Sequence, residues 1–158
     1  MRPAPRHACG VRESPAATVG NAPGSGTVHA QISDETFLAV DRPSVAAIVA
    51  QRGRWADWWP DLRLELTRDR GPQGCQWVLT GHIGGTAEIY LEPWHDGTLV
   101  HLFLRLDLPG PARPGHLEWA LRRRALAWKA TITRLKDELE AGRAPGTPAR
   151  AAHVAPGT

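Results

Sequence analysis

The 158-residue sequence has little cysteine and no long apolar run. Cys9 lies in a stretch rich in proline and alanine and Cys75 in an expected strand, so we expect no structural disulfide, which fits a reducing compartment. The N-terminus lacks the apolar core of a signal peptide, and nothing approaches the ~20 apolar residues of a membrane span. We therefore expect a cytoplasmic protein that does not span a membrane.

The central part of the chain has no excess of positive charge, although the sequence pI is about 9.4. Residues 1–26 carry three arginines and one glutamate, net +2, and residues 143–158 carry two arginines, net +2. The total of +3 leaves −1 for residues 27–142. This distribution gives the central part no general attraction for phosphate, and we expect no nucleic-acid partner. The one local basic cluster, Arg122, Arg123 and Arg124, is either a solvated helix face or a phosphate contact.

Phenylalanine and tyrosine are also scarce, and seven of the ten aromatic residues are tryptophan. Tryptophan is large and rigid and carries one N–H donor, so it suits cores and ligand cavities alike. Large apolar side chains are almost absent from residues 1–26, and residues 143–158 have a similar composition. We expect both segments to be disordered tails that flank one domain, residues 27–142.

Hydrophobic periodicity predicts the elements of this domain. Residues 27–40 are typical of a strand, residues 43–51 of a helix ended by Gly53, and residues 55–59 of a second helical turn stopped by Pro60. Four strands then follow within residues 62–106, joined by short connections that imply antiparallel neighbours. We assign their aliphatic positions to one concave face: Leu62, Leu64, Leu66, Trp77, Leu79, Ala87, Ile89, Leu91, Val100, Leu102, Leu104 and Leu106.

One long helix closes the domain. From residue 115 to residue 142 an apolar residue recurs every three or four positions, with charged residues largely outside that stripe. The helix needs a broad apolar surface, which the concave face of a curved sheet supplies. The fold class is therefore α+β, a curved antiparallel sheet wrapped around a long C-terminal helix, with two short helices after the first strand.

Three stretches carry a resemblance to a known family. They are the Trp55-Ala-Asp-Trp-Trp-Pro60 turn followed by a strand, the Tyr90-Leu-Glu-Pro93 and Asp96-Gly-Thr98 hairpin, and the final helix with Trp128 and Leu135-Lys-Asp-Glu-Leu139. Over residues 27–142 the chain resembles the START-related, polyketide cyclase/dehydrase-like (SRPBCC) superfamily. The resemblance implies a helix-grip fold, and its members include binders, carriers and enzymes. Such domains often have more strands between the helix pair and the last helix than the four expected here.

The first functional hypothesis is binding or carriage of a small hydrophobic, lipid- or polyketide-like ligand between the sheet and the last helix. Trp55, Trp58 and Trp59 are either an aromatic lip over the cavity or a hydrophobic plug, and Trp128 is either core or cavity lining. The candidate ligand-binding residues are Trp55, Trp58, Trp59, Trp77, Leu79, Ile89, Leu102, Leu104, Trp128 and Ile132.

An aromatase/cyclase or dehydratase-type enzyme using the same cavity is the alternative that the resemblance allows. It would rely on Glu88, Tyr90 and His101 as acid and base. If the strand parity were reversed, Glu88, His101 and Arg105 would line the cavity. A third hypothesis is a partner- or nucleic-acid-binding module that uses the basic tails. No catalytic residue is evident, and no cofactor is expected.

We expect no metal site, because His82, His95 and His101 fall on different turns or strands without the spacing of metal ligands. The glycine-rich residues 81–85 lack the features of a phosphate loop, so we expect a turn between strands there. The identity of the ligand and the oligomeric state are not determined by the sequence.

Overall fold

A long strand is followed by two short helices, a four-stranded meander and a long helix in the computed structural model, which describes residues 16–21, 26–110, 113–144 and 146–148. The elements are β1 (Ala16–Asn21), β2 (Thr27–Leu38), α1 (Arg42–Val49), α2 (Arg52–Trp58), β3 (Arg63–Asp69), the 3-10 turn η1 (Gly71–Gln73), β4 (Gly74–Thr80), β5 (Gly84–Trp94), β6 (Gly97–Pro109) and α3 (Pro114–Leu139).

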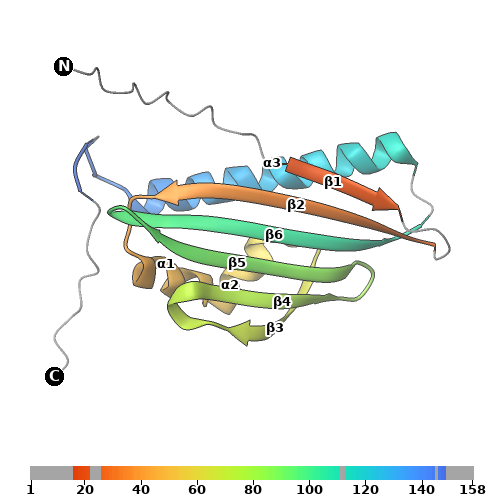
Figure 1. Ribbon diagram of the computed structural model, residues 1–158, viewed down its shortest axis with the longest axis horizontal. Helices are drawn as coiled ribbons and strands as arrows, with labels where there is room; N and C mark the ends of the chain where they lie inside the picture. The colour runs from red at the N-terminus through yellow and green to blue at the C-terminus, as the bar shows by residue number, and fades with distance from the viewer. Residues whose placement is uncertain (1–15, 22–25, 111–112, 145, 149–158) are drawn as a thin grey trace, which may run out of the picture.

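All six strands belong to one antiparallel sheet in the order β1-β2-β6-β5-β4-β3. The three helices lie on one side of this sheet, and α3 runs lengthwise behind β1 and β2 (Figure 1). The meander β3–β6 and the position of α3 confirm the expected helix-grip arrangement.

The expected strand parity is correct. The aliphatic side chains of β4, β5 and β6 are almost fully buried, and those of Leu64 and Leu66 on β3 are partly buried. Leu117, Leu121, Ala125, Trp128, Ile132 and Leu135 of α3 belong to the same core cluster. The apolar stripe of α3 and the aliphatic face of the sheet therefore form one continuous core.

Two expectations from the sequence are wrong. Residues 16–21, which we assigned to a disordered tail, form β1 and pair with residues 28–33 of β2. A strand held at a sheet edge by backbone hydrogen bonds needs little apolar content, so composition alone missed it. Of the other residues assigned to the tails, 1–15, 22–25, 145 and 149–158 lie outside the described part of the chain. Gly53 does not end the first helix: α1 ends at Val49, and Gly53 lies in the first turn of α2.

Two glycines occupy positions that no other residue fits. Gly74 and Gly85 have φ values of 102° and 128°, and a Cβ atom at either would lie 2.0 Å from a carbonyl oxygen of the neighbouring strand. Gly85 is the second residue of β5, directly after the β4–β5 connection, so the glycines of residues 81–85 serve a strand-to-strand turn as expected.

Beyond the residues that pair with β1, hydrogen bonds join the C-terminal end of α3 to the end of β2. The Lys136 Nζ donates to the Phe37 carbonyl oxygen at 2.8 Å, and the Ala39 N–H donates to the Glu140 Oε1 at 2.7 Å. Burial alone would raise the pKa of Glu140, but the hydrogen bonds from Lys136 and Ala39 and the nearby positive charges outweigh it and lower that pKa. The Glu140 carboxylate therefore stabilises the folded state.

We expect Glu140→Gln to destabilise the protein by about 1 kcal/mol at neutral pH, because the charged hydrogen bonds weaken. A carboxyl whose pKa is lowered on folding stabilises above its unfolded pKa of about 4.3 and loses that contribution as pH falls through the folded value. Urea unfolding should therefore show a clear difference between variant and parent at neutral pH and almost none at about pH 2.5. Asp137→Asn, at an exposed position of the same helix, is the control. A deficit independent of pH would contradict this role.

Candidate functional site

Five tryptophans meet in the space between the sheet and the helices. Trp55, Trp58 and Trp59 come from α2 and its C-cap, Trp77 comes from β4 and Trp128 from α3. The rings of Trp59 and Trp128 are stacked with centroids 5.4 Å apart, whereas Trp55 meets Trp77 edge-on at 5.1 Å. Edge-on contacts also join Trp58 to Trp59 and to Trp128, and Trp59 to Trp77. We call these five residues the tryptophan cluster.

The structure places all ten candidate ligand-binding residues in the buried core. Their exposed fractions lie between 1% for Trp77 and 9% for Trp58. The tryptophans of α2 pack inward on Trp77 and Trp128, which favours the plug over an exposed lip. Ligand binding by these residues remains a prediction.

The indole N–H groups of the cluster differ in their partners. Trp55 donates to the Val49 carbonyl oxygen at 2.8 Å, and Trp128 donates to the Asp34 carboxylate at 3.0 Å. The Nε1 atoms of Trp59 and Trp77 are buried with no hydrogen-bond partner among the described residues. A buried donor without an acceptor costs free energy, so these two atoms mark a place where an acceptor would bind favourably.

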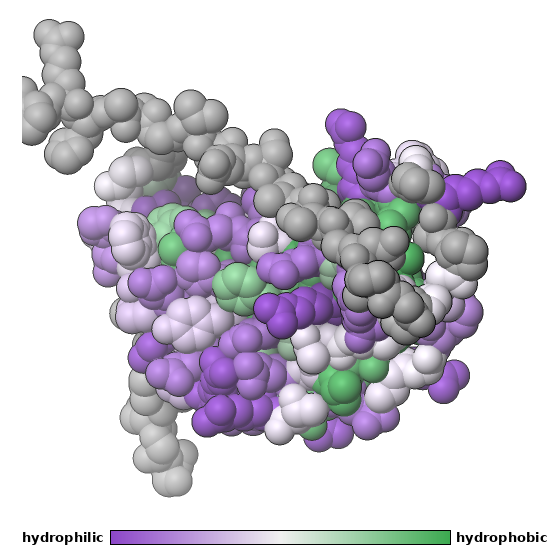
Figure 2. Space-filling model, turned by 45° about the vertical axis from the view of Figure 1, so that its right-hand side comes forward, coloured by the Kyte–Doolittle hydropathy of each residue, from purple (hydrophilic) through white to green (hydrophobic). Residues whose placement is uncertain are grey.

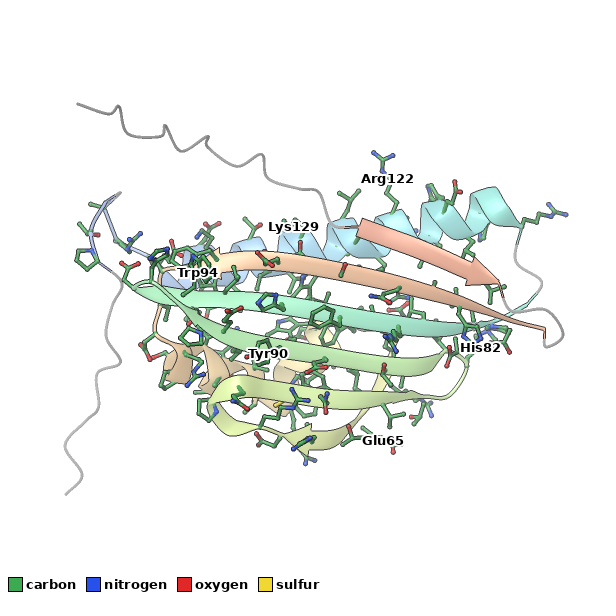
Figure 3. All side chains as sticks on the ribbon, viewed as in Figure 1. Glu65, His82, Tyr90, Trp94, Arg122 and Lys129 are labelled. Carbon is green, nitrogen blue, oxygen red and sulfur yellow. The ribbon has the colours of Figure 1, made fainter. Side chains whose placement is uncertain are left out.

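A buried carboxylate joins β2 to α3 beside the cluster. The Asp34 side chain is 2% exposed, and its Oδ1 lies 2.7 Å from the Lys129 Nζ. Its Oδ2 accepts from Trp128 and, at 3.1 Å, from the Thr36 hydroxyl, which also accepts from Lys129. In Figure 3, Lys129 is labelled where α3 passes behind the upper strands of the sheet.

Sequence reasoning missed Asp34, because Ser33–Glu35 reads as a polar patch within a strand. A usable signal was present: Asp34 continues the inward-facing series of Ala30 and Ile32. An acidic side chain at an inward-facing position of a strand needs a hydrogen-bonding or charged partner from the element that packs on that face.

The acid/base set considered for an enzyme lies on the opposite, outer face of the sheet. His101 is held between Glu92, 3.0 Å from its Nε2, and Glu35, 3.4 Å from its Nδ1, and its ring lies beside that of Tyr90. Glu88 accepts hydrogen bonds from Arg70 and Gln76. The reversed parity is therefore wrong, and Glu88, Tyr90 and His101 do not line the space between sheet and α3. Tyr90, which belongs to β5, is labelled in Figure 3.

Among the described residues, no group of three or more His, Cys, Asp and Glu side chains is arranged to hold a metal ion. His82 and His95 are exposed. Burial raises the pKa of the Cys75 thiol to about 11, so this thiol is protonated and poorly nucleophilic at neutral pH. Within the same part of the chain, no helix is long and apolar enough to cross a membrane.

Two surface hollows of about 470 and 490 Å³ are formed by residues that include the outward-facing side chains of β2, β5 and β6. None of the ten candidate residues lines either hollow. Figure 2 shows a mainly hydrophilic surface with small hydrophobic areas on the face it presents. The five rings of the tryptophan cluster contact one another, so a ligand placed among them would have to separate them.

The fold and the enclosed cluster define a helix-grip domain, and the comparisons with solved structures agree. The Aha1 dimer from Colwellia psychrerythraea has a TM-score of 0.53 at 14% identity, covering 72% of this chain and 98% of that one. CalU16 from Micromonospora echinospora has a TM-score of 0.51 at 16% identity, covering 83% and 86%. A Deinococcus radiodurans protein has a TM-score of 0.51 at 14% identity, covering 71% and 98%. These similarities show the fold alone. No family model and no curated protein matches the sequence.

We expect Asp34→Ala to lower the free energy of unfolding by about 2 kcal/mol, because it leaves the buried Trp128 N–H unpaired while the partly exposed Lys129 can turn to water. Asp34→Asn keeps an acceptor for Trp128 and should lose about half as much. Urea denaturation measures both, with Glu35→Ala at the exposed neighbour as the control. Equal stability of Asp34→Ala and the parent would show that the Asp34 network does not hold α3 in place.

Proposed function

We propose that the protein binds a small, flat, mostly apolar molecule that carries a hydrogen-bond acceptor, and that it does so within the tryptophan cluster. This proposal places the chain in the START-related superfamily whose residue pattern it resembles. The site is expected to comprise the five tryptophans together with Leu79, Ile89, Leu102, Leu104 and Ile132. Carriage of a lipid- or polyketide-like molecule is the form of this function that the resemblance suggests.

The buried, unpartnered N–H groups of Trp59 and Trp77 are the observation that carries the proposal. A carbonyl or hydroxyl oxygen beside either group would offset the cost of burying it, and the aromatic rings would supply apolar contact area. Binding sites of this kind are largely apolar with a few polar groups that orient the ligand. An acceptor-free hydrocarbon of the same shape should therefore bind more weakly.

Entry to the cluster is expected between α2 and α3. Arg54 of α2 pairs with Glu138 of α3 at 2.9 Å, and Arg124 of α3 pairs with Asp61, which follows α2. The carboxylates of both pairs are more than half exposed, and ion pairs at the surface contribute little stability. Trp58, the most exposed tryptophan of the cluster, contacts Trp128 across this boundary. Separating α2 from α3 would therefore admit a ligand without disrupting the sheet.

A matched pair of tricyclic compounds tests the proposal. Fluorenone carries a carbonyl oxygen that fluorene lacks, and quenching of tryptophan fluorescence measures the binding of each. We expect fluorenone to bind about tenfold more tightly than fluorene, because only fluorenone satisfies a buried indole N–H. Equal affinity for the two compounds, or no binding of either, would contradict the proposal.

Variants within the cluster locate the contact. Trp59→Phe and Trp77→Phe each remove one unpartnered donor and keep most of the aromatic area, so they should reduce the preference for fluorenone about three- to tenfold. Trp58→Phe alters the same cluster but neither unpartnered donor, and it should leave the preference unchanged. A preference that survives replacement of both Trp59 and Trp77 would place the ligand elsewhere.

A further inference from the structure

The outward side of α3 exposes two large hydrophobic side chains. Trp119 is 54% exposed and Leu126 is 58% exposed, the largest values among the large hydrophobic residues that the structure describes. They are seven residues apart, so they lie on the same side of the helix, separated by two turns or about 10 Å along its axis. This side faces away from the core, since Leu121, Ala125 and Trp128 occupy the buried stripe.

Positive charge surrounds these two side chains. Arg122 and Arg123 are exposed and have no carboxylate partner among the described residues, and the Arg123 guanidinium lies 4.8 Å over the Trp119 ring. Figure 3 shows Arg122 pointing away from the sheet. Residues 113–134 carry six Lys or Arg and one Glu, and two of the six are paired with Asp61 and Asp34, so the net charge is 6 − 1 − 2 = +3. We call Trp119, Arg122, Arg123 and Leu126 the α3 ridge.

We propose that the α3 ridge docks on the surface of an anionic phospholipid bilayer. A helix on a membrane surface places tryptophan and leucine at the boundary between headgroups and acyl chains, while arginine side chains reach the lipid phosphates. The ridge presents both kinds of group on one convex helix face. Membrane docking does not depend on the proposed ligand site, which lies on the buried side of the same helix.

Other occupants of the ridge fit its chemistry less well. A second copy would bring like charge against like charge, and residues 1–15 and 149–158 carry net charges of +2 and +1, so neither tail complements it. Two hydrophobic side chains are too few for the apolar centre of a stable protein interface. Nucleic acid would engage the arginines but leave Leu126 without a role, and Arg123 covers one face of the Trp119 ring.

Sedimentation with vesicles tests the proposal on the full chain. At low salt we expect about tenfold more protein bound to phosphatidylcholine vesicles containing roughly 30% phosphatidylglycerol than to phosphatidylcholine alone. Replacing both Trp119 and Leu126 by serine should reduce binding to the anionic vesicles about fivefold or more, and so should replacing Arg122 and Arg123 by glutamine. The replaced side chains are exposed, so the variants should fold, which circular dichroism checks.

A matched control uses the exposed aromatic residues of the outer sheet face. Trp94 is 48% and Phe103 is 42% exposed, and their joint replacement by serine should leave vesicle binding unchanged. Equal loss in this control and in the Trp119/Leu126 variant would overturn the proposal, as would the absence of binding to anionic vesicles. Binding to a DNA duplex that requires Arg122 and Arg123 but neither Trp119 nor Leu126 would assign the ridge to nucleic acid instead.

Discussion

The buried Asp34 carboxylate, which accepts from Trp128 and pairs with Lys129, fixes how the long helix lies on the sheet. An apolar stripe alone lets a helix slide by a turn, because one leucine replaces another at small cost, whereas a buried carboxylate must meet its donors. Three further polar contacts continue this seam, from Lys129 to Thr36, from Lys136 to Phe37 and from Glu140 to Ala39. From residue 34 to 39 a strand advances about 17 Å, and from residue 129 to 140 a helix advances about 16.5 Å. Strand and helix therefore run side by side in the same direction, and the two segments that make these contacts have nearly the same length.

The tryptophan cluster depends on that alignment. The position of Trp128 depends on how α3 lies along β2. Its ring neighbours Trp58 and Trp59 are positioned by α2, which follows β2 and α1 in the chain. Large, rigid indole rings fill the space between the sheet and the helices, but each ring also carries an N–H donor that needs an acceptor when it is buried. The donors of Trp55 and Trp128 find acceptors in the described part of the protein, whereas the buried donors of Trp59 and Trp77 do not. A core made for stability alone would use leucine or phenylalanine at the positions of Trp59 and Trp77, so the unpaired donors are the feature that distinguishes this interior from ordinary packing.

Periodicity was sufficient to predict the layers of this protein, because the sheet and the helix each bury one face. Alternating leucines located β3–β6 and their inward side, and the stripe through Trp128 located α3. The missed features depend on pairing and contacts that side-chain periodicity does not report. β1 is recognisable only by its backbone pairing with β2, and Asp34 is stabilised by Trp128 and Lys129, about 95 residues away. The contacts among the tryptophans have the same origin, so the sequence indicated which residues are apolar but not how their rings meet.

Three consecutive arginines show how much of the chemistry of α3 follows from helical geometry. Successive residues of an α-helix are turned by about 100°, so Arg122, Arg123 and Arg124 cannot all share one environment. Arg124 turns toward Asp61 and helps to close the boundary with α2, whereas Arg123 covers Trp119 and Arg122 extends into solvent. A single basic run in the sequence thus divides between a structural ion pair and an exposed surface. The ion pair and the exposed surface belong to the same helix, whose buried side carries Trp128. Binding at the exposed surface of α3 would therefore act on the helix that also encloses the tryptophan cluster.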